Sequence, residues 1–381
     1  MNYDVAVVGL GGIGSAILAH CASRGARVIG LEQFGPAHEF GSSTGRSRMI
    51  RKAYFEDPAY VPLLLRAYDL WRELEQATGE NLLRITGLLM VGKEDAEILA
   101  GARSSATRHG LTIEVLSRAA IGKRFPTLRI LPNEIGVFEP DGGVLAPERA
   151  VQAHLRVATR AGARLCFGSR VERWDAGDEG FNLQLADGAQ VSARALVLAM
   201  GPWFGEVMKS LGVALRIQRN VQAWFTPASD AYDGGRFPPF LLDREGLPAP
   251  LYGFPDFGDG VKAAFHAHGP CEEIDRLDRE IVRQKDLDPI VAAMADWMPG
   301  ATQTFRAAKV CPYSLTPDSH FVVDPHPQHA RLILCGGFSG HGFKFAPVIG
   351  EIAADLALEG SSRHPIDFLS LRRFASDRGP R

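Results

Sequence analysis

Apolar residues at the start of the chain form two short runs that flank glycines and a helical stretch. The run 4–8 precedes glycines spaced as Gly9-x-Gly11-x-x-Gly14, a helical pattern covers 15–22, and a second apolar run covers 27–31. An apolar run before such glycines is typical of a buried strand that turns sharply into a helix. We therefore predict a strand, helix and second strand in the first 32 residues.

Helical spacing of apolar residues continues further along the chain. Between 60 and 78, apolar side chains recur every three or four positions, which predicts an amphipathic helix. Further helices are predicted over 94–109 and 117–124, and Pro147 is well placed to begin another over 147–161.

Short β-like runs dominate the middle of the chain. Strands are predicted over 164–167, 182–185 and 195–201, with a hairpin turn at Asp187-Gly188. From about 216 to 300, short apolar runs joined by Pro- and Gly-rich turns predict an antiparallel sheet, followed by a charged helical stretch over 273–297. We interpret this region as a second domain inserted into the first.

A glycine-dense loop follows the last predicted strand, 332–335, and Pro347 is placed to begin a helix after it. Such a loop brings backbone N–H groups and the positive end of a helix together, so an electron-rich group is expected there. Lys344 is the one fixed charge in this apolar loop.

The opening glycines predict a dinucleotide site. One glycine permits the turn, one lets the backbone approach a pyrophosphate, and one lets the helix pack on the strand. Glu32 ends the second strand, where a carboxylate can accept hydrogen bonds from ribose hydroxyls. The alternative is a tight turn without a ligand.

Two other features have a functional and an ordinary interpretation. Arg48 and Arg51 follow a loop over 33–47, and on a helix they would share a face and could bind one anion; the alternative is a solvated basic turn. Gly201 ends an apolar strand, where it can let the backbone approach a ligand or simply end the strand.

Composition narrows the choice of partners and compartment. The 381 residues include 42 basic and 44 acidic side chains, a net charge of −2, which gives no reason to expect nucleic acid or an anionic membrane as partner. The five cysteines are scattered, which argues against a disulfide framework and a structural zinc site. No signal peptide or membrane-spanning run is recognised, so we expect a cytoplasmic protein without bound metal.

Taken together, these stretches resemble the monomeric sarcosine oxidase family of flavoenzymes, which includes N-methyltryptophan oxidase and peroxisomal pipecolate oxidase. The resemblance runs nearly end to end. It is carried by the opening glycines, Gly41-Ser42, Gly45-x-x-Arg48-x-Ile50-Arg51-x-Ala53-Tyr54, Tyr252-Gly253-Phe254-Pro255, Lys262 with His266, Cys311-x-Tyr313 and the run from Gly337 to Lys344.

The resemblance implies FAD, attached covalently through a cysteine thioether, with Cys311 at the matching position. Without the resemblance, a lone cysteine before a proline is more often a buried small hydrophobe. The predicted cofactor-binding residues are Gly9, Gly11, Gly14, Glu32, Ser42, Ser43, Arg48, Gly201, Cys311, Gly337, Gly340, Gly342 and Lys344.

The resemblance also implies catalytic and substrate-binding roles. Arg51 and Lys344 would clamp the substrate carboxylate. Arg48 would lie near the flavin ring, and Lys262 would lie over its face near N5 and stabilise superoxide when oxygen reacts. Tyr252 and His266 would line the substrate cavity; read alone, they are an ordinary strand tyrosine and a satisfied histidine.

The implied fold is α/β, with a Rossmann-like FAD-binding domain and an inserted antiparallel-sheet substrate domain, similar to glutathione reductase and D-amino-acid oxidase. We assign residues 1–84, 146–214 and 308–381 to the FAD-binding domain, and 85–145 and 215–307 to the substrate domain. The resemblance favours a monomer.

The expected reaction is oxidation of a secondary, N-methyl or cyclic, amino acid to an imine by oxygen, with release of hydrogen peroxide. The amine must lose its proton first, and a cavity between cations favours the neutral form. Ser43-Thr44 replaces a His-His pair common in the family, and the run Arg51 to Tyr54 looks more like the pipecolate branch, which leaves the substrate open. The alternatives are a flavin dehydrogenase with another electron acceptor and a flavin-binding protein without turnover.

Overall fold

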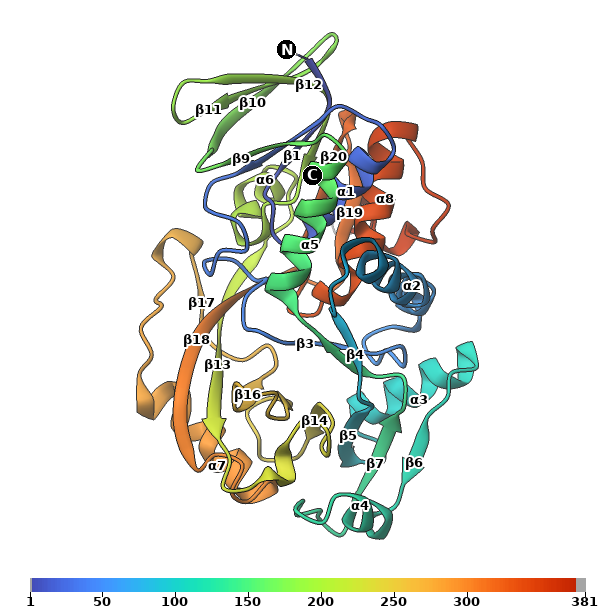
Figure 1. Cartoon of the computed structure of the whole chain (residues 1–381), viewed down its shortest axis with the longest axis vertical. Coiled ribbons are helices and arrows are strands. Elements are labelled where there is room, and N and C mark those ends of the chain that lie inside the picture. The colour runs from blue at the N-terminus through green and yellow to red at the C-terminus, as the bar shows by residue number, and fades with distance from the viewer. Residues whose placement is uncertain (1, 375–381) are drawn as a thin grey trace, which may run out of the picture.

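The computed structural model describes residues 2–374 and contains an eight-stranded sheet in the upper half of Figure 1. In the part of the sheet formed by β1, β2, β9, β12 and β20, adjacent strands run parallel. Strands β10, β11 and β19 pair with their neighbours in antiparallel orientation. The strands are β1 (Asn2–Val8), β2 (Val28–Glu32), β9 (Arg164–Phe167), β10 (Val171–Gly177), β11 (Gly180–Leu185), β12 (Gln190–Leu198), β19 (Val322–His326) and β20 (His329–Gly336).

Helices cover one face of this sheet. Helix α1 (Gly12–Ser23) packs between α5 (Pro147–Arg160) and α8 (Ala346–Glu359), and α2 (Val61–Thr78) lies against α5 and α8 (Figure 1). In β1, Val5 and Val7 belong to the core under these helices, whereas Ala6 and Val8 pack on the opposite face. Because β1 is buried on both faces, its sequence is a continuous apolar run rather than an alternating one.

The lower half of Figure 1 contains a nine-stranded sheet, and its neighbouring strands are antiparallel except for β5 and β14. Two separate segments of the chain supply it. Its strands are β5 (Leu88–Lys93), β6 (Glu114–Leu116), β7 (Glu134–Glu139), β13 (Arg216–Thr226), β14 (Phe240–Asp243), β15 (Leu251–Phe254), β16 (Val261–Phe265), β17 (Cys271–Glu272) and β18 (Thr304–Leu315). The helices of this half are α3 (Glu97–His109), α4 (Arg118–Arg124) and α7 (Asp288–Trp297).

A three-stranded sheet lies between the two larger sheets. It consists of β3 (Arg48–Ile50), β8 (Gly143–Leu145) and β4 (Leu83–Ile85), and the short helix α6 (Gly205–Ser210) follows β12. The predicted α/β class with a second, antiparallel sheet is confirmed. The division into domains at 84, 145, 214 and 307 stays a prediction; β18 runs through residue 307 and pairs with β13.

One local prediction was wrong, and one arrangement considered for Arg48 is not formed. Of the predicted helix over 273–297, only α7 is an α-helix, preceded by one π turn at Arg283–Leu287. Upstream, buried Arg219 donates to the carbonyls of Asp278 and Glu280 and pairs with Asp286, which holds this part of the chain in an irregular path. Arg48 lies on β3 rather than on a helix, because this segment pairs with β8.

Candidate functional site

A cavity of about 820 Å³ opens at the carboxyl ends of β1, β2 and β12. Ligands of open α/β sheets bind at this edge. Eleven of the thirteen residues predicted to bind the cofactor line this cavity, and Gly14 and Lys344 do not; the eleven are Gly9, Gly11, Glu32, Ser42, Ser43, Arg48, Gly201, Cys311, Gly337, Gly340 and Gly342.

The opening glycines are required by close contacts of the backbone. Gly9 has φ +88°, and a Cβ there would lie 2.5 Å from the carbonyl oxygen of Ala199. A Cβ on Gly14 would lie 1.8 Å from the carbonyl oxygen of Gly9, so Gly14 lets α1 pack against the turn. The first turn of α1 faces the cavity, where its N–H groups favour an anion.

Ser43 and Glu32 both bond to the backbone at the start of this helix. The Ser43 hydroxyl accepts a 2.9 Å hydrogen bond from the Gly12 N–H, so it caps α1. The Glu32 carboxylate accepts hydrogen bonds from the N–H groups of Leu10 and Phe34. Burial acts to raise the Glu32 pKa, but bonds from His38 and these two N–H groups outweigh it, and the pKa is lowered. An ionised acceptor therefore lines the cavity.

A second cavity, of about 70 Å³, adjoins the first. Arg48, Tyr313, Gly340 and Phe343 line both, so the two share a wall. All four residues predicted to bind substrate line the smaller cavity; they are Arg51, Lys344, Tyr252 and His266.

Arg51 is buried at this smaller cavity, and only one of its guanidinium nitrogens is hydrogen-bonded within the described residues. Its Nη2 donates to both carboxylate oxygens of Glu56, at 2.7 and 2.8 Å, and the group lies 4.3 Å from the ring centroids of Tyr54 and Phe55. Its Nε and Nη1 are buried and have no hydrogen-bond partner among residues 2–374. Buried donors of a charged group are costly when unpaired, so this geometry favours a ligand with acceptor oxygens.

Lys344 lies near Arg51 on the turn that follows the glycine-dense loop. Its Nζ donates a 2.6 Å hydrogen bond to the carbonyl of His341. Burial, together with the charges of Arg51 and Arg48, lowers the Lys344 pKa to about 7, and Glu56 acts in the opposite direction. Burial also lowers the His266 pKa to about 4, so this imidazole is neutral near pH 7.

Arg48 and Cys311 lie where the two cavities meet. Arg48 donates to the carbonyls of Ser42, Thr44 and Ser47, and its Nη2 lies 3.6 Å from the Cys311 sulfur. Cys311 lies on β18, is buried and borders the larger cavity. Arg48 therefore orders the 42–47 loop and places a fixed cation beside the thiol.

Lys262 does not line either cavity. Its Nζ donates to the carbonyls of Gly45 and Ser47, at 2.8 and 3.0 Å, which places the amine behind the loop that precedes Arg48. Burial, with Arg48 second, lowers its pKa well below the usual value. Lys262 therefore contacts the loop that precedes Arg48, and not the cavities themselves. Its role in the reaction with oxygen stays a prediction.

The sequence did not indicate three residues of the smaller cavity. Glu56, Tyr313 and His341 line it, and Glu56 has its pKa lowered to about 2, because Arg51, His341 and Lys344 outweigh the effect of burial. Tyr313 and His341 lay within motifs that carried the resemblance, but nothing in their spacing marked them as site residues. Glu56 resembles any acidic residue of a solvated loop until its contact with Arg51 is seen.

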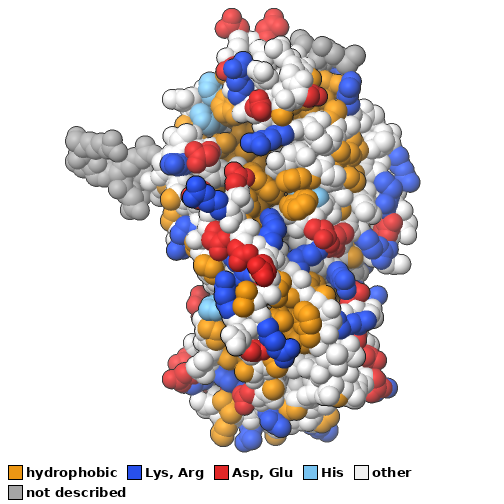
Figure 2. Space-filling model, turned by 90° about the vertical axis from the view of Figure 1, so that its left-hand side faces the viewer, with side chains coloured by type: hydrophobic (Ala, Val, Ile, Leu, Met, Phe, Trp, Pro, Cys, Tyr) orange, Lys and Arg blue, Asp and Glu red, His pale blue; other side chains and the backbone are white. Residues whose placement is uncertain are grey.

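The rest of the described chain offers neither a metal centre nor a membrane span. Residues 2–374 contain no group of three His, Cys, Asp or Glu side chains placed to hold a metal ion. No helix within them combines the length and apolarity needed to cross a bilayer. On the face drawn in Figure 2, acidic and basic side chains are interspersed.

Comparisons with known proteins agree with this geometry. A family model described as DAO, FAD dependent oxidoreductase, matches residues 4–356. The chain is 43% identical to a monomeric sarcosine oxidase of Streptomyces avermitilis, over 98% of both chains, and 32% identical to an N-methyl-L-tryptophan oxidase of Yersinia pestis, over 98% of this chain and 100% of that one. The open form of NikD, described as an unusual amino acid oxidase, has a TM-score of 0.85 at 25% identity and covers 97% of each chain.

Proposed function

The chain belongs to the FAD dependent oxidoreductase family, as a relative of the monomeric sarcosine oxidases, and we propose that it oxidises small secondary amino acids with oxygen. The observation that carries this proposal is the pair of buried, unpartnered donors on Arg51 beside Lys344, in a cavity that adjoins the larger one. A carboxylate is the group that suits a guanidinium and an ammonium at the same point.

The larger cavity fits FAD. The Gly9–Gly14 turn and the N-terminus of α1 suit the pyrophosphate, Glu32 suits the ribose, and Cys311 and the 337–344 loop suit the isoalloxazine end. When bound, FAD would supply the redox chemistry, namely removal of a hydride equivalent from the substrate carbon and reduction of oxygen to hydrogen peroxide.

The residues of the chain orient the substrate and adjust its protonation. Arg51 and Lys344 hold the carboxylate, which directs the amine toward the shared wall of the two cavities. The cations Arg48, Arg51 and Lys344 outnumber the Glu56 carboxylate in this cavity, and the excess of positive charge lowers the pKa of the substrate amine and favours its neutral form. Tyr252 and the neutral His266 also line this cavity and add no charge to it.

We propose that FAD is attached through the Cys311 sulfur. The thiol borders the larger cavity, and Nη2 of Arg48 lies 3.6 Å from its sulfur. The test is acid precipitation of the purified protein. Yellow colour in the pellet of the wild-type protein, absent from the pellet of Cys311→Ser, is expected; free flavin in the wild-type supernatant would contradict the attachment.

The function is tested with a panel of sarcosine, N-methyltryptophan, pipecolate and proline, in an assay for peroxide. Peroxide release with at least one of these amines is expected. Flavin reduction without peroxide would instead indicate a dehydrogenase, and no flavin reduction by any amine would indicate a flavin-binding protein without turnover.

Three further statements belong to this proposal. A monomer is favoured by the name of the relatives, monomeric sarcosine oxidase. A cytoplasmic location is favoured by five cysteines without disulfides. The two large sheets favour the division into two domains given in the sequence analysis. Because β18 belongs to the sheet of the substrate domain, we place the end of that domain after β18 rather than at residue 307.

A further inference from the structure

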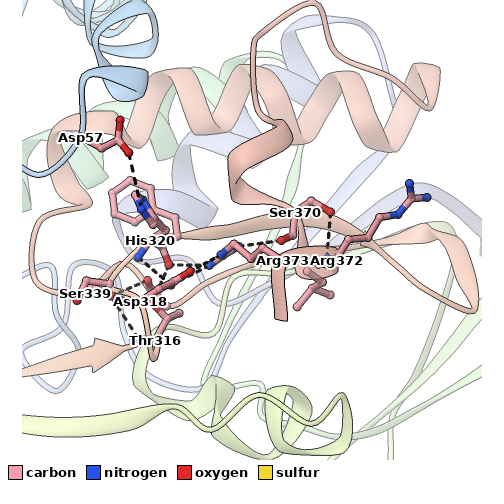
Figure 3. Close-up of polar contacts among 12 residues, drawn as sticks. Asp57, Thr316, Asp318, His320, Ser339, Ser370, Arg372 and Arg373 are labelled. Atoms are coloured by element: carbon pink, nitrogen blue, oxygen red, sulfur yellow. Dashed lines mark hydrogen bonds and ion pairs between the residues drawn. The ribbon is translucent and has the colours of Figure 1, made fainter. Parts of the chain in front are cut away.

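The end of the described chain is tied to the 316–320 turn, which is hydrogen-bonded to His341, a residue of the smaller cavity. Arg373, in the 3₁₀ turn Leu371–Phe374, pairs with Asp318 at 2.7 Å and donates a 3.0 Å hydrogen bond to the carbonyl of His320. Figure 3 shows the Arg373 side chain directed toward Asp318, whereas the side chain of the neighbouring Arg372 points away. Arg373 lines neither cavity, and its contacts with Asp318 and His320 connect it to the site through the 316–320 turn.

This turn has a conformation that needs external support. Ser319 has φ +62°, in the left-handed region that residues with a side chain rarely adopt. Within the turn, the Thr316 hydroxyl donates to the carbonyl of His320 at 2.7 Å. Arg373 bonds to the same carbonyl and to Asp318, so it holds the turn from both sides of Ser319.

The first link from the turn to the cavity runs through His341. Its Nε2 donates a 3.1 Å hydrogen bond to the carbonyl of Ser319. Burial lowers the His341 pKa to about 3, so the ring is neutral, and its Nδ1 accepts from the hydroxyl of Tyr54. The carbonyl of His341 in turn accepts from Lys344 Nζ at 2.6 Å. Hydrogen bonds through His341 therefore connect Ser319 to Lys344.

The second link runs through His320. Its ring stacks on Tyr60 at 5.7 Å between centroids, and its Nε2 lies 3.9 Å from Asp57. Asp57 directly follows Glu56, the carboxylate that holds Arg51. The turn therefore contacts Asp57, the neighbour of the carboxylate that pairs with Arg51, and His341, whose carbonyl accepts from Lys344.

We propose that Arg373 is a positioning residue for substrate binding: by holding the 316–320 turn, it sets the places of Lys344 and of the loop that carries Glu56. This inference rests on the proposed function, in which the cavity between Arg51 and Lys344 binds a carboxylate. The residue is far from the reacting atoms, so its loss should weaken binding of the carboxylate rather than slow the chemical step.

The test uses the FAD-loaded protein and three variants, Arg373→Ala, Asp318→Asn and, as the matched control, the exposed neighbour Arg372→Ala. Acetate, a carboxylate without an amine, is titrated while the flavin absorbance is followed, and kcat and KM are measured with sarcosine. We expect Arg373→Ala to raise the acetate Kd and the KM by roughly tenfold with kcat nearly unchanged, since small displacements of positioning groups have effects of this size or larger.

Asp318→Asn should act in the same direction, and the double variant should be no worse than Arg373→Ala alone, because both changes remove the Arg373–Asp318 ion pair and Arg373→Ala already removes the bond to His320 as well. Arg372→Ala should match the wild type. Equal acetate Kd values for Arg373→Ala and Arg372→Ala, or a lowered Tm without a change in Kd, would overturn the proposal. If Arg373→Ala does not fold, Asp318→Asn against Arg372→Ala decides it.

The acetate titration requires no turnover. A wild-type protein whose flavin no amine reduces would contradict the proposed function, while the comparison of acetate Kd values would still test the role of Arg373.

Discussion

The walls of the two adjoining cavities consist of different kinds of chemical group. The larger is shaped by backbone, with glycines at the strand ends and the N–H groups of α1, and a carboxylate and hydroxyls fix its loops. The smaller is shaped by charged side chains, the cations Arg48, Arg51 and Lys344 and the carboxylate of Glu56. A binding site formed by the backbone tolerates changes of charge and loses its ligand when an added side chain fills the space. A binding site formed by charged side chains fails when one member of an ion pair is removed.

The largest effect should come from Arg51→Met. The substitution removes the two unpartnered donors proposed for the carboxylate and leaves Glu56 buried without its cation. Two charged hydrogen bonds are worth about 1.5–3 kcal/mol each, so KM should rise on the order of 100-fold or more. Lys52→Ala is the control, because this neighbouring amine pairs with Asp141 and lies outside both cavities. Similar KM values in the two variants would remove Arg51 from substrate binding.

A smaller effect, confined to the other cavity, is expected from Gly14→Ala. The added methyl would meet the Gly9 carbonyl at 1.8 Å, so the turn must shift. Overpacking of this kind costs about 1–3 kcal/mol, and the flavin content of the purified protein should fall severalfold, as measured by the ratio of flavin to protein absorbance. Gly35→Ala, with open space around the glycine, should retain full flavin. Full flavin in Gly14→Ala as well would show that the turn is not required.

The smallest effect concerns the protonation of Lys344. Its pKa of about 7 means that the ammonium is present below pH 7 and is lost above it. Arg51 stays charged, and His266, with a pKa of about 4, stays neutral, so the affinity for acetate should fall as pH rises, by about fivefold between about pH 6 and about pH 8. In Lys344→Met this dependence should vanish. A pH-independent Kd in the wild type would mean that Lys344 does not contact the carboxylate.

The same contrast explains what could be predicted from the sequence. The Gly9–Gly14 turn, Glu32 and helices α1, α2, α5 and α8 follow local patterns of spacing, and local patterns are visible in one stretch of sequence. The resemblance supplied Arg51, Lys344, Tyr252 and His266, which the structure brings to one cavity.

Other features depend on contacts between distant segments. Glu56 gains its role only from the buried guanidinium of Arg51, and Ser43 only from the start of α1. The irregular path before α7 is set by Arg219, more than fifty residues upstream. A pattern within one stretch contains no information about such pairs, so the predicted helix over 273–297 was wrong in its first half.

The central claim is that the smaller cavity presents a carboxylate-bearing amine to the flavin in the larger one. The most direct test is anaerobic stopped-flow reduction of the bound flavin by sarcosine and by sarcosinamide, which keeps the N-methyl amine and replaces the carboxylate with a neutral amide. We expect sarcosine to bleach the flavin and sarcosinamide to do so at least about 100-fold less efficiently, because Arg51 and Lys344 lose their ionic partner. Equal reduction by both compounds would contradict the claim.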